Sequence, residues 1–219
     1  MKVTKEEKEE KRLEKLKKER ERLFIMGEYE RKHSDCEYIC GIDEVGRGPF
    51  AGPVMAGAVI LPKDCEILYL NDSKKLSEKK REALYEEIKE KALSWAVARV
   101  EPERIDEINI LQATFEAMRE AVSKLDIRPD ILLVDAVHIP DIDIPQDSIV
   151  KGDAKSLSIA AASVMAKVTR DNIMKEYAKE YPGYGFEKNM GYGTAQHREA
   201  LKEYGPTPIH RRSFIHNYV

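Results

Sequence analysis

The sequence lacks the features that mark secreted, disulfide-bonded or membrane proteins. Only three of its 219 residues are cysteine, and this small odd number fits reduced thiols better than a disulfide framework. No apolar run approaches the roughly 18 residues of a membrane span, and the charged N-terminus has no apolar core of a signal peptide. We therefore expect a cytoplasmic protein that contacts no membrane.

A large excess of one charge is also missing. The net charge of -3 argues against a polycation that grips nucleic acid over its whole surface. Residues 1–35 carry 12 Lys/Arg against 10 Asp/Glu, whereas residues 154–219 carry 10 Lys/Arg against 6 Asp/Glu. Acidic groups thus concentrate in the middle of the chain and basic groups near its end, which would suit a polyanion held over an acidic, metal-filled centre.

A zinc site has little support in the sequence. His33, Cys36 and Cys40 lie close together along the chain, but no second close pair of Cys or His residues completes a set of four ligands. We interpret these residues as unpaired thiols and a surface histidine.

Length and composition allow one sizeable hydrophobic core. At 219 residues and 42% hydrophobic content, the default is a single domain with an appendage. Residues 1–35 form a charged run without proline, and without glycine before Gly27, so they predict a solvated, weakly amphipathic helical extension. Residues 36–219 are then the main folded domain.

The stretch Gly41–Gly57 has the most unusual composition in the chain. It holds five of the 12 glycines around the acidic pair Asp43 and Glu44 and the isolated Arg47. A strand over residues 39–42 would direct the two carboxylates to opposite faces, and both can reach a metal at a strand edge. The glycine on each side of Arg47 indicates a sharp turn or a close approach to a ligand. An ordinary acidic turn is the alternative, which seventeen residues of this composition fit poorly.

Apolar patterning predicts the remaining elements. Strands are expected at residues 39–42, 54–61, 96–100, 131–134 and 148–151, and helices after Ser77, from Pro102, from Asn109, within residues 150–171 and from Thr194 to Tyr204. The helix from Asn109 has a stripe of large apolar residues that we assign to the core, namely Leu111, Phe115, Met118, Val122 and Leu125.

Two further acids stand at the ends of predicted elements. Asp135 closes the buried strand 131–134, and Asp153 precedes a helix rich in small residues. A loop start and a helix cap are the plain explanations for these two positions. If the four acids converge, divalent cations such as Mg²⁺ or Mn²⁺ must offset their repulsion. Two such ions about 3.5–4 Å apart would support in-line attack of water on a phosphodiester.

A second glycine cluster, residues 181–194, interleaves glycines with aromatic residues. Tyr184, Phe186 and Tyr192 are in a position to present flat rings to a sugar or base, and a structured surface loop is the alternative. Residues 206–212 form a basic tail bounded by proline. Weaker candidates for phosphate contacts are Lys74, Lys75, Lys155, Lys167 and Arg170.

Six motifs, taken in order, closely resemble those of the type 2 ribonuclease H family, ribonuclease HII. They are GIDEVGRGPFAGPV, DSKKLS, NILQAT, LLVDA, KGDAKSLSIAAASVMAKVTRD and GYGT. The resemblance covers roughly residues 37–219 and implies an α/β, ribonuclease H-like fold. In this fold a mixed sheet of about five strands is flanked by helices, with a helical C-terminal part.

The resemblance also implies residue roles. The metal-binding catalytic acids are expected to be Asp43, Glu44, Asp135 and Asp153. A loop that senses the ribose 2′-hydroxyl, the group that separates RNA from DNA, is expected at Gly46, Arg47 and Gly48. Tyr192 is similar to the aromatic residue that stacks on the neighbouring deoxyribose, and Lys155 is a further candidate for substrate binding.

The implied activity is that of an endoribonuclease using two Mg²⁺ or Mn²⁺ ions. It cuts the RNA strand of RNA–DNA hybrids and incises 5′ of single ribonucleotides in duplex DNA, and we expect it to act as a monomer. A junction resolvase of the same fold would have no need of the Gly-Arg-Gly loop. A non-catalytic hybrid-binding protein would be hindered by four intact acids, which repel phosphates without metal. Residues 1–35 are too few for the extra N-terminal domain of the type 3 relatives.

Overall fold

A five-stranded mixed sheet forms the centre of the computed structural model, which describes residues 5–218. Its strands are β1 (Ile39–Val45), β2 (Val54–Ile60), β3 (Ser94–Val100), β4 (Ile131–Asp135) and β5 (Gln146–Ile149), in the spatial order β3-β2-β1-β4-β5. β1, β2 and β3 are antiparallel neighbours, whereas β4 and β5 run parallel to β1. The expected hairpin of the first two strands is confirmed, with β1 at the centre of the sheet.

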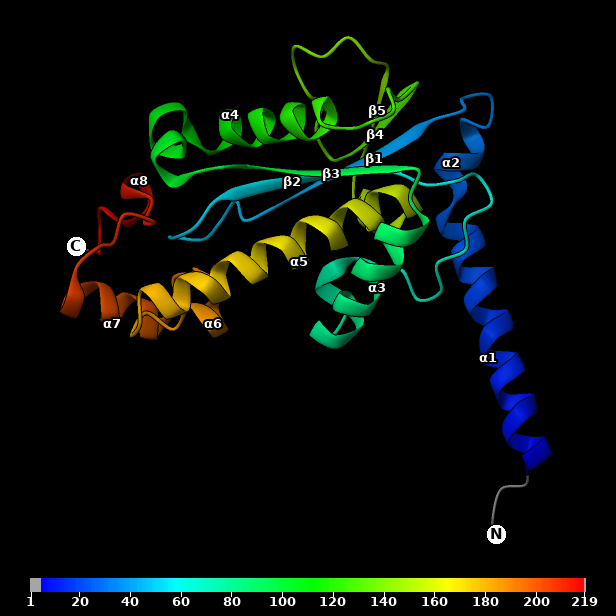
Figure 1. Ribbon diagram of the computed structural model, residues 1–219, viewed down its shortest axis with the longest axis horizontal. Helices are drawn as coiled ribbons and strands as arrows, with labels where there is room; N and C mark the ends of the chain where they lie inside the picture. The colour runs from blue at the N-terminus through cyan, green and yellow to red at the C-terminus, as the bar shows by residue number, and fades with distance from the viewer. Residues whose placement is uncertain (1–4, 219) are drawn as a thin grey trace.

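Helices cover both faces of the sheet (Figure 1). α4 (Pro102–Ser123) packs on one face, and α5 (Leu157–Glu180) packs on the other with α3 (Glu78–Lys91) beside it. The C-terminal part consists of α6 (Phe186–Asn189), α7 (Ala195–Tyr204) and α8 (Arg212–Ile215). Two single turns of 3-10 helix, η1 (Ser73–Lys75) and η2 (Gly152–Ala154), lie in the connections. This is the α/β arrangement that we expected.

Glycines let α5 lie unusually close to the sheet. A Cβ atom added at Gly41 of β1 would lie 2.0 Å from the carbonyl carbon of Ser158, and one at Gly57 of β2 would lie 2.4 Å from the carbonyl oxygen of Ala162. Real Cβ atoms do not approach other atoms so closely, so any side chain there would push the helix away. The small residues of α5 and these two glycines together fix the distance between helix and sheet.

α4 contains a kink where the sequence predicts the start of a second helix. Asn109 has φ 68° and ψ 165°, and its side-chain oxygen accepts hydrogen bonds from the amides of Leu111 (3.0 Å) and Gln112 (3.2 Å). The predicted start of a helix at Asn109 is therefore confirmed, with Asn109 as its cap. The assignment of Leu111 to the core is wrong, because its side chain is 41% exposed, whereas Met118 and Val122 of the same stripe are buried.

Three other expectations need correction. β1 continues through the acidic pair to Val45, because its last residues still pair with β2, and β5 begins two residues earlier than predicted. Tyr184 and Phe186 are buried in the C-terminal core instead of facing outward. The basic tail folds back on the molecule, and Arg211 has no exposed surface.

From Lys5 on, the N-terminal extension is helical, as predicted, with a break at Gly27; residues 1–4 of that prediction lie outside the described residues. α1 (Lys5–Met26) projects from one end of the molecule (Figure 1), and α2 (Glu28–Lys32) follows it. Leu23 and Met26, at the end of α1, are buried against α3 and α5. The three cysteines are all free. Within residues 5–218 no helix combines the length and apolar character needed to cross a bilayer.

Candidate active site

Three segments bring the predicted acids to one region of the molecule. In the parallel pair of β1 and β4, Ile42 lies beside Val134, so the residues that follow, Asp43 and Asp135, stand at the same level of the sheet. Asp153 lies on η2, in the short connection from β5 to α5. The carboxyl ends of these parallel strands therefore supply the acidic side chains, and the turn before α5 adds the last one.

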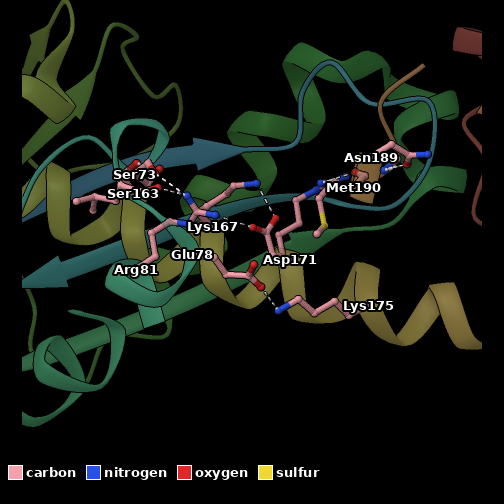
Figure 2. A network of polar contacts seen from close by, with 12 residues as sticks. Ser73, Glu78, Arg81, Ser163, Lys167, Asp171, Lys175, Asn189 and Met190 are labelled. Carbon is pink, nitrogen blue, oxygen red and sulfur yellow. Dashed lines mark hydrogen bonds and ion pairs between the residues drawn. The ribbon is translucent and has the colours of Figure 1, made fainter. Parts of the chain in front are cut away.

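Asp43 is the most deeply buried of the four acids. Its side chain is 3% exposed and accepts a hydrogen bond from the amide of Glu44 at 2.7 Å. Burial, and then repulsion by Glu44 and Asp135, raise the pKa of Asp43 well above its usual range, although a hydrogen bond with Ser163 opposes this. The Ser163 hydroxyl lies 2.8 Å from that of Ser73 (Figure 2). Asp43 is thus a buried acid with too few donors for a stable negative charge.

Asp135 lies close enough to both Glu44 and Asp153 to repel their charges. Asp135 accepts a hydrogen bond from the amide of Gly152 at 2.7 Å, which ties the end of β4 to η2. Burial, and then the nearby Asp72 and Asp135, raise the pKa of Asp153, which is 7% exposed. Burial raises the pKa of Glu44 too, and repulsion by Asp135 adds to this against the opposing charge of Arg47.

The four acids are neighbours, but their side chains do not yet surround a common point. Within residues 5–218, no three His, Cys, Asp or Glu side chains are arranged closely enough to hold a metal ion. The donor set nevertheless suits a hard divalent cation, because it consists of carboxylate oxygens alone. The raised pKa values of Asp43, Glu44 and Asp153 also suit a cation site, since a bound cation would relieve the repulsion that contributes to them.

Sequence reasoning missed Asp72 and placed too little weight on Lys74. Burial lowers the pKa of Lys74, but the charges of four acids more than offset this effect, so the pKa is raised. Those acids are Asp43, Asp153, Asp72 and Glu44. Both residues belong to the DSKKLS motif, which is the signal that could have drawn attention to them.

A polar network holds the DSKKLS loop onto α5 (Figure 2). Arg81 of α3 donates a hydrogen bond to the carbonyl of Ser73 at 3.1 Å and forms an ion pair with Asp171 of α5 at 3.7 Å. Lys167 donates to the same aspartate at 2.6 Å. Lys167 is therefore paired within α5 to the aspartate that also binds Arg81, which differs from the phosphate contact considered for it.

Two buried arginines organise the loop that follows β1, residues 46–53, which we call the reader loop. Arg170 of α5 and Arg211 have no exposed surface, and their guanidinium groups donate to six backbone carbonyls at 2.6–3.1 Å. These are the carbonyls of Pro53, Met190, Ala51, Gly52, Arg47 and Gly46. Burial lowers the pKa of Arg170 to about 10 and that of Arg211 to about 9. Arg170 is therefore not available for the phosphate contact that the sequence suggested.

The reader loop presents two of the three predicted sensor residues at the surface. Gly46 is buried with φ +88°, and a Cβ atom there would lie 2.3 Å from Nε of Arg170, so only glycine fits. Arg47 and Gly48 are exposed, and Nη1 of Arg47 lies 3.6 Å from Oε1 of Glu44. The loop therefore adjoins the acids directly.

Tyr192 lies beside the reader loop. Its ring is 47% exposed, and a Cβ atom at Gly48 would lie 3.6 Å from its Cε1 atom. The carbonyl of Tyr192 accepts from Nδ1 of His197 at 3.0 Å, and Nε2 of His197 lies 2.9 Å from Nε2 of His210. Because the amide of Thr207 donates to Nδ1 of His210, the proton of His210 is on Nε2 and is donated to His197. Two buried, neutral histidines thus support the backbone of Tyr192.

Lys155 is exposed but faces a different part of the surface. It lines a cleft of about 350 Å³ together with residues of α1 and α2, among them Arg22 and Tyr29. The structure thus groups eight of the nine predicted site residues around the acids and the reader loop, and it places Lys155 beside the N-terminal helices.

A family model for ribonuclease HII matches residues 40–217 of the chain. The chain belongs to the ribonuclease HII family. A ribonuclease HII of Lachnoclostridium phytofermentans is 65% identical over 208 residues, which cover 95% of this chain and 82% of the relative. A ribonuclease HII of Clostridioides difficile is 55% identical over 211 residues, covering 95% of this chain and 83% of the relative. The activity is accordingly that of a ribonuclease HII, a metal-dependent endoribonuclease.

Solved structures of ribonuclease HII proteins have the same fold. The ribonuclease H2 of Pyrococcus horikoshii superposes with a TM-score of 0.68 at 30% identity, covering 80% of this chain and 93% of that one. The Archaeoglobus fulgidus ribonuclease HII, solved in complex with PCNA, gives a TM-score of 0.66 at 29% identity with the same coverage. The expected ribonuclease H-like fold is confirmed. The family model begins at residue 40, so α1 and α2 lie outside it.

Proposed function

We propose that Asp43, Glu44, Asp135 and Asp153 hold two divalent cations, Mg²⁺ or Mn²⁺, and are the catalytic acids. The observation that supports this best is that the four side chains are neighbours whose charges oppose one another. Such a cluster is costly without a counter-charge. Bound cations would activate a water and stabilise the leaving oxygen of a phosphodiester.

The residues of the chain supply positioning and charge around this centre. The hydrogen bond from Gly152 fixes the orientation of Asp135, and the amide of Glu44 does the same for Asp43. Lys74, whose charge faces the acids, is suited to contact the substrate phosphate that must approach them. This lysine offsets the repulsion between the acids and the incoming polyanion.

The reader loop and Tyr192 are proposed to select the substrate. In the part of the chain that the structure describes, the backbone amides of Arg47 and Gly48 have no hydrogen-bond acceptor, so they are available to a ribose 2′-hydroxyl. The exposed ring of Tyr192 beside Gly48 offers a flat surface for the next sugar. The substrates are RNA–DNA hybrids and duplex DNA with single ribonucleotides, cut 5′ of the ribonucleotide. The enzyme is proposed to act as a cytoplasmic monomer.

The decisive experiment uses a DNA duplex with one embedded ribonucleotide. We expect a single cut on the 5′ side of the ribonucleotide with Mg²⁺ or Mn²⁺ and none with a chelator. An all-DNA duplex of the same sequence is the matched control and should stay intact. Equal cutting of the all-DNA duplex would contradict the sensing of the 2′-hydroxyl, and cutting in chelator would contradict the metal site.

A further inference from the structure

The N-terminal helices α1 and α2, which we call the arm, form hydrogen bonds with particular segments of the catalytic domain. Their polar contacts with the domain include hydrogen bonds to two segments, residues 69–70 and residues 147–158. The first segment immediately precedes Asp72 and Lys74, and the second contains Asp153. Two segments outside the strands contribute residues to the acidic cluster, and the arm forms hydrogen bonds with or next to both of them.

α2 is attached to the start of α5 through one carboxylate. Oε1 of Glu30 accepts from the hydroxyl of Ser156 at 2.6 Å and from the amide of Ser158 at 2.9 Å. Ser156 is the N-cap of α5, and its hydroxyl oxygen in turn accepts from the amide of Ile159. A carboxylate at this place satisfies unpaired amides and favours the positive end of the helix. Asp153 lies only three residues before this cap.

Residues at the end of α2 contact the N-terminal part of segment 147–158. Oδ2 of Asp147 on β5 accepts from Nζ of Lys32 at 2.8 Å and lies 3.2 Å from Nε2 of His33. Asp147 pairs with Leu133 of β4 in the sheet. The connection that carries Asp153 is thus attached to the arm before and after η2.

α1 makes a second attachment near Lys74. Oε1 of Glu19 accepts from the amide of Tyr69 at 2.7 Å, and Nη2 of Arg22 donates to the carbonyl of Leu70 at 2.6 Å. Tyr69 has φ 68°, a backbone conformation that is uncommon for a residue other than glycine. The arm therefore stabilises a strained turn at Tyr69, three residues before Asp72.

We propose that the arm is a brace that positions Asp153 and the loop of Asp72 and Lys74 for metal binding. This inference rests on the proposed metal site. Loop segments between strands and helices move more easily than the strand ends that carry Asp43 and Asp135. Glu30 and Glu19 are the positioning residues, because each accepts the backbone amide of a segment that leads to the site.

Glu30→Ala tests the first attachment, with Glu28→Ala as the matched control. Glu28 is an exposed acid on the same helix and makes no hydrogen bond or ion pair with residues 147–158. Glu30→Ala should speed hydrogen exchange of the amides from 152 to 158 and weaken Mn²⁺ binding to the substrate-free protein. The expected weakening is roughly tenfold, at the lower end of the cost of losing an outer-shell partner. kcat should fall while KM for the duplex stays unchanged.

Glu30→Gln keeps one oxygen that can accept from the two serines, so it should retain most of the Mn²⁺ affinity. If the alanine protein does not fold, Lys32→Ala, which removes the attachment to Asp147, is the test variant and should weaken Mn²⁺ binding. For the second attachment, Glu19→Ala is compared with Glu21→Ala, an exposed acid of α1. Only Glu19→Ala should speed exchange of the Tyr69 amide and weaken Mn²⁺ binding.

The outcomes separate the brace from the metal site itself. If Asp43→Asn weakens Mn²⁺ binding and Glu30→Ala only lowers Tm, the brace is wrong and the proposed function stands. If neither variant changes Mn²⁺ binding, the metal site is wrong. A change in KM alone would show that the arm contacts the substrate directly, which also overturns the brace.

Discussion

The acidic cluster and the reader loop solve the problem of buried charge in opposite ways. Asp43 and Asp153 are buried acids, and burial together with repulsion by neighbouring acids raises their pKa values. Arg170 and Arg211 are buried bases, yet six backbone carbonyls accept from them. The comparison indicates that the loop is already built, whereas we propose that cations complete the acidic cluster.

The two regions also obtain their geometry from different sources. The acids of β1 and β4 take their places from the register of a parallel strand pair, which backbone hydrogen bonds fix. The reader loop has no such ladder, and its shape comes from side chains that lie 117 to 165 residues away along the chain. Charge changes should therefore affect function in the first region and stability in the second.

The largest effect is expected for Asp43→Asn, which removes a proposed ligand charge at unchanged size. kcat on the single-ribonucleotide duplex should fall by at least about a thousandfold, because activation of the attacking water depends on bound metal. Without divalent cations the variant should be at least as stable as the parent. The folded-state pKa of Asp43 is raised, so ionisation of this group costs stability as pH rises above its unfolded pKa.

Asp143→Asn is the control for this variant, because Asp143 is an exposed loop acid. It should leave both kcat and the free energy of unfolding unchanged. Retained cleavage in Asp43→Asn would contradict the assignment of the acids. A large loss of stability would instead show that Asp43 is a structural residue, and the contrast with the reader loop would disappear.

Arg211→Lys should have the next largest effect, and on stability. Lysine lacks the planar fork that reaches Gly46, Arg47 and Gly52 together, so buried carbonyls would lose their donors. We expect the free energy of unfolding to fall by about 3 kcal/mol, as for broken buried polar networks. Denaturant unfolding measures this, with Arg212→Lys as the control at the exposed next residue. An unchanged midpoint would show that the loop does not depend on this arginine.

The difference between the regions also explains what the sequence could predict. Asp43 and Asp135 could be placed because each lies at a predicted strand, and the cap of Asn109 is a local signal along the chain. Arg170 and Arg211 were misread because arginine is usually exposed, and their acceptors come from distant turns. The roles of Asp72 and Lys74 could not be predicted for a related reason. They depend on which acids the fold brings near these two residues.

Lowering the pH should have opposite effects on the stability contributed by His210 and on that contributed by the acidic cluster. Burial lowers the pKa of His210 to about 4, so the folded state favours its neutral form. Its contribution to stability is present above the unfolded pKa of about 6.5 and is lost as pH falls toward 4. At pH 5 the loss should be about 2 kcal/mol. The raised pKa values of the acids act the other way, because protonation relieves their repulsion.

Comparison with His210→Gln isolates this contribution, since the acids are the same in both proteins. The difference in free energy of unfolding between parent and variant should shrink by about 2 kcal/mol from pH 7 to pH 5. Urea unfolding at each pH measures the difference. A constant difference over this range would mean that His210 has nearly the same pKa in the folded and unfolded states, and burial of a neutral His210 would be contradicted.

The smallest effect is expected at the exposed edge of the reader loop. Tyr192→Ala removes the ring beside Gly48 without disturbing a buried charge, so stability should stay the same. Loss of the stacking surface should cost about 1 kcal/mol, or roughly fivefold in kcat/KM, for the single-ribonucleotide duplex. A long hybrid should lose less, because it does not depend on a deoxyribose at the junction. Tyr192→Phe keeps the ring and should behave as the parent, whereas a larger loss on the long hybrid would place Tyr192 away from the junction.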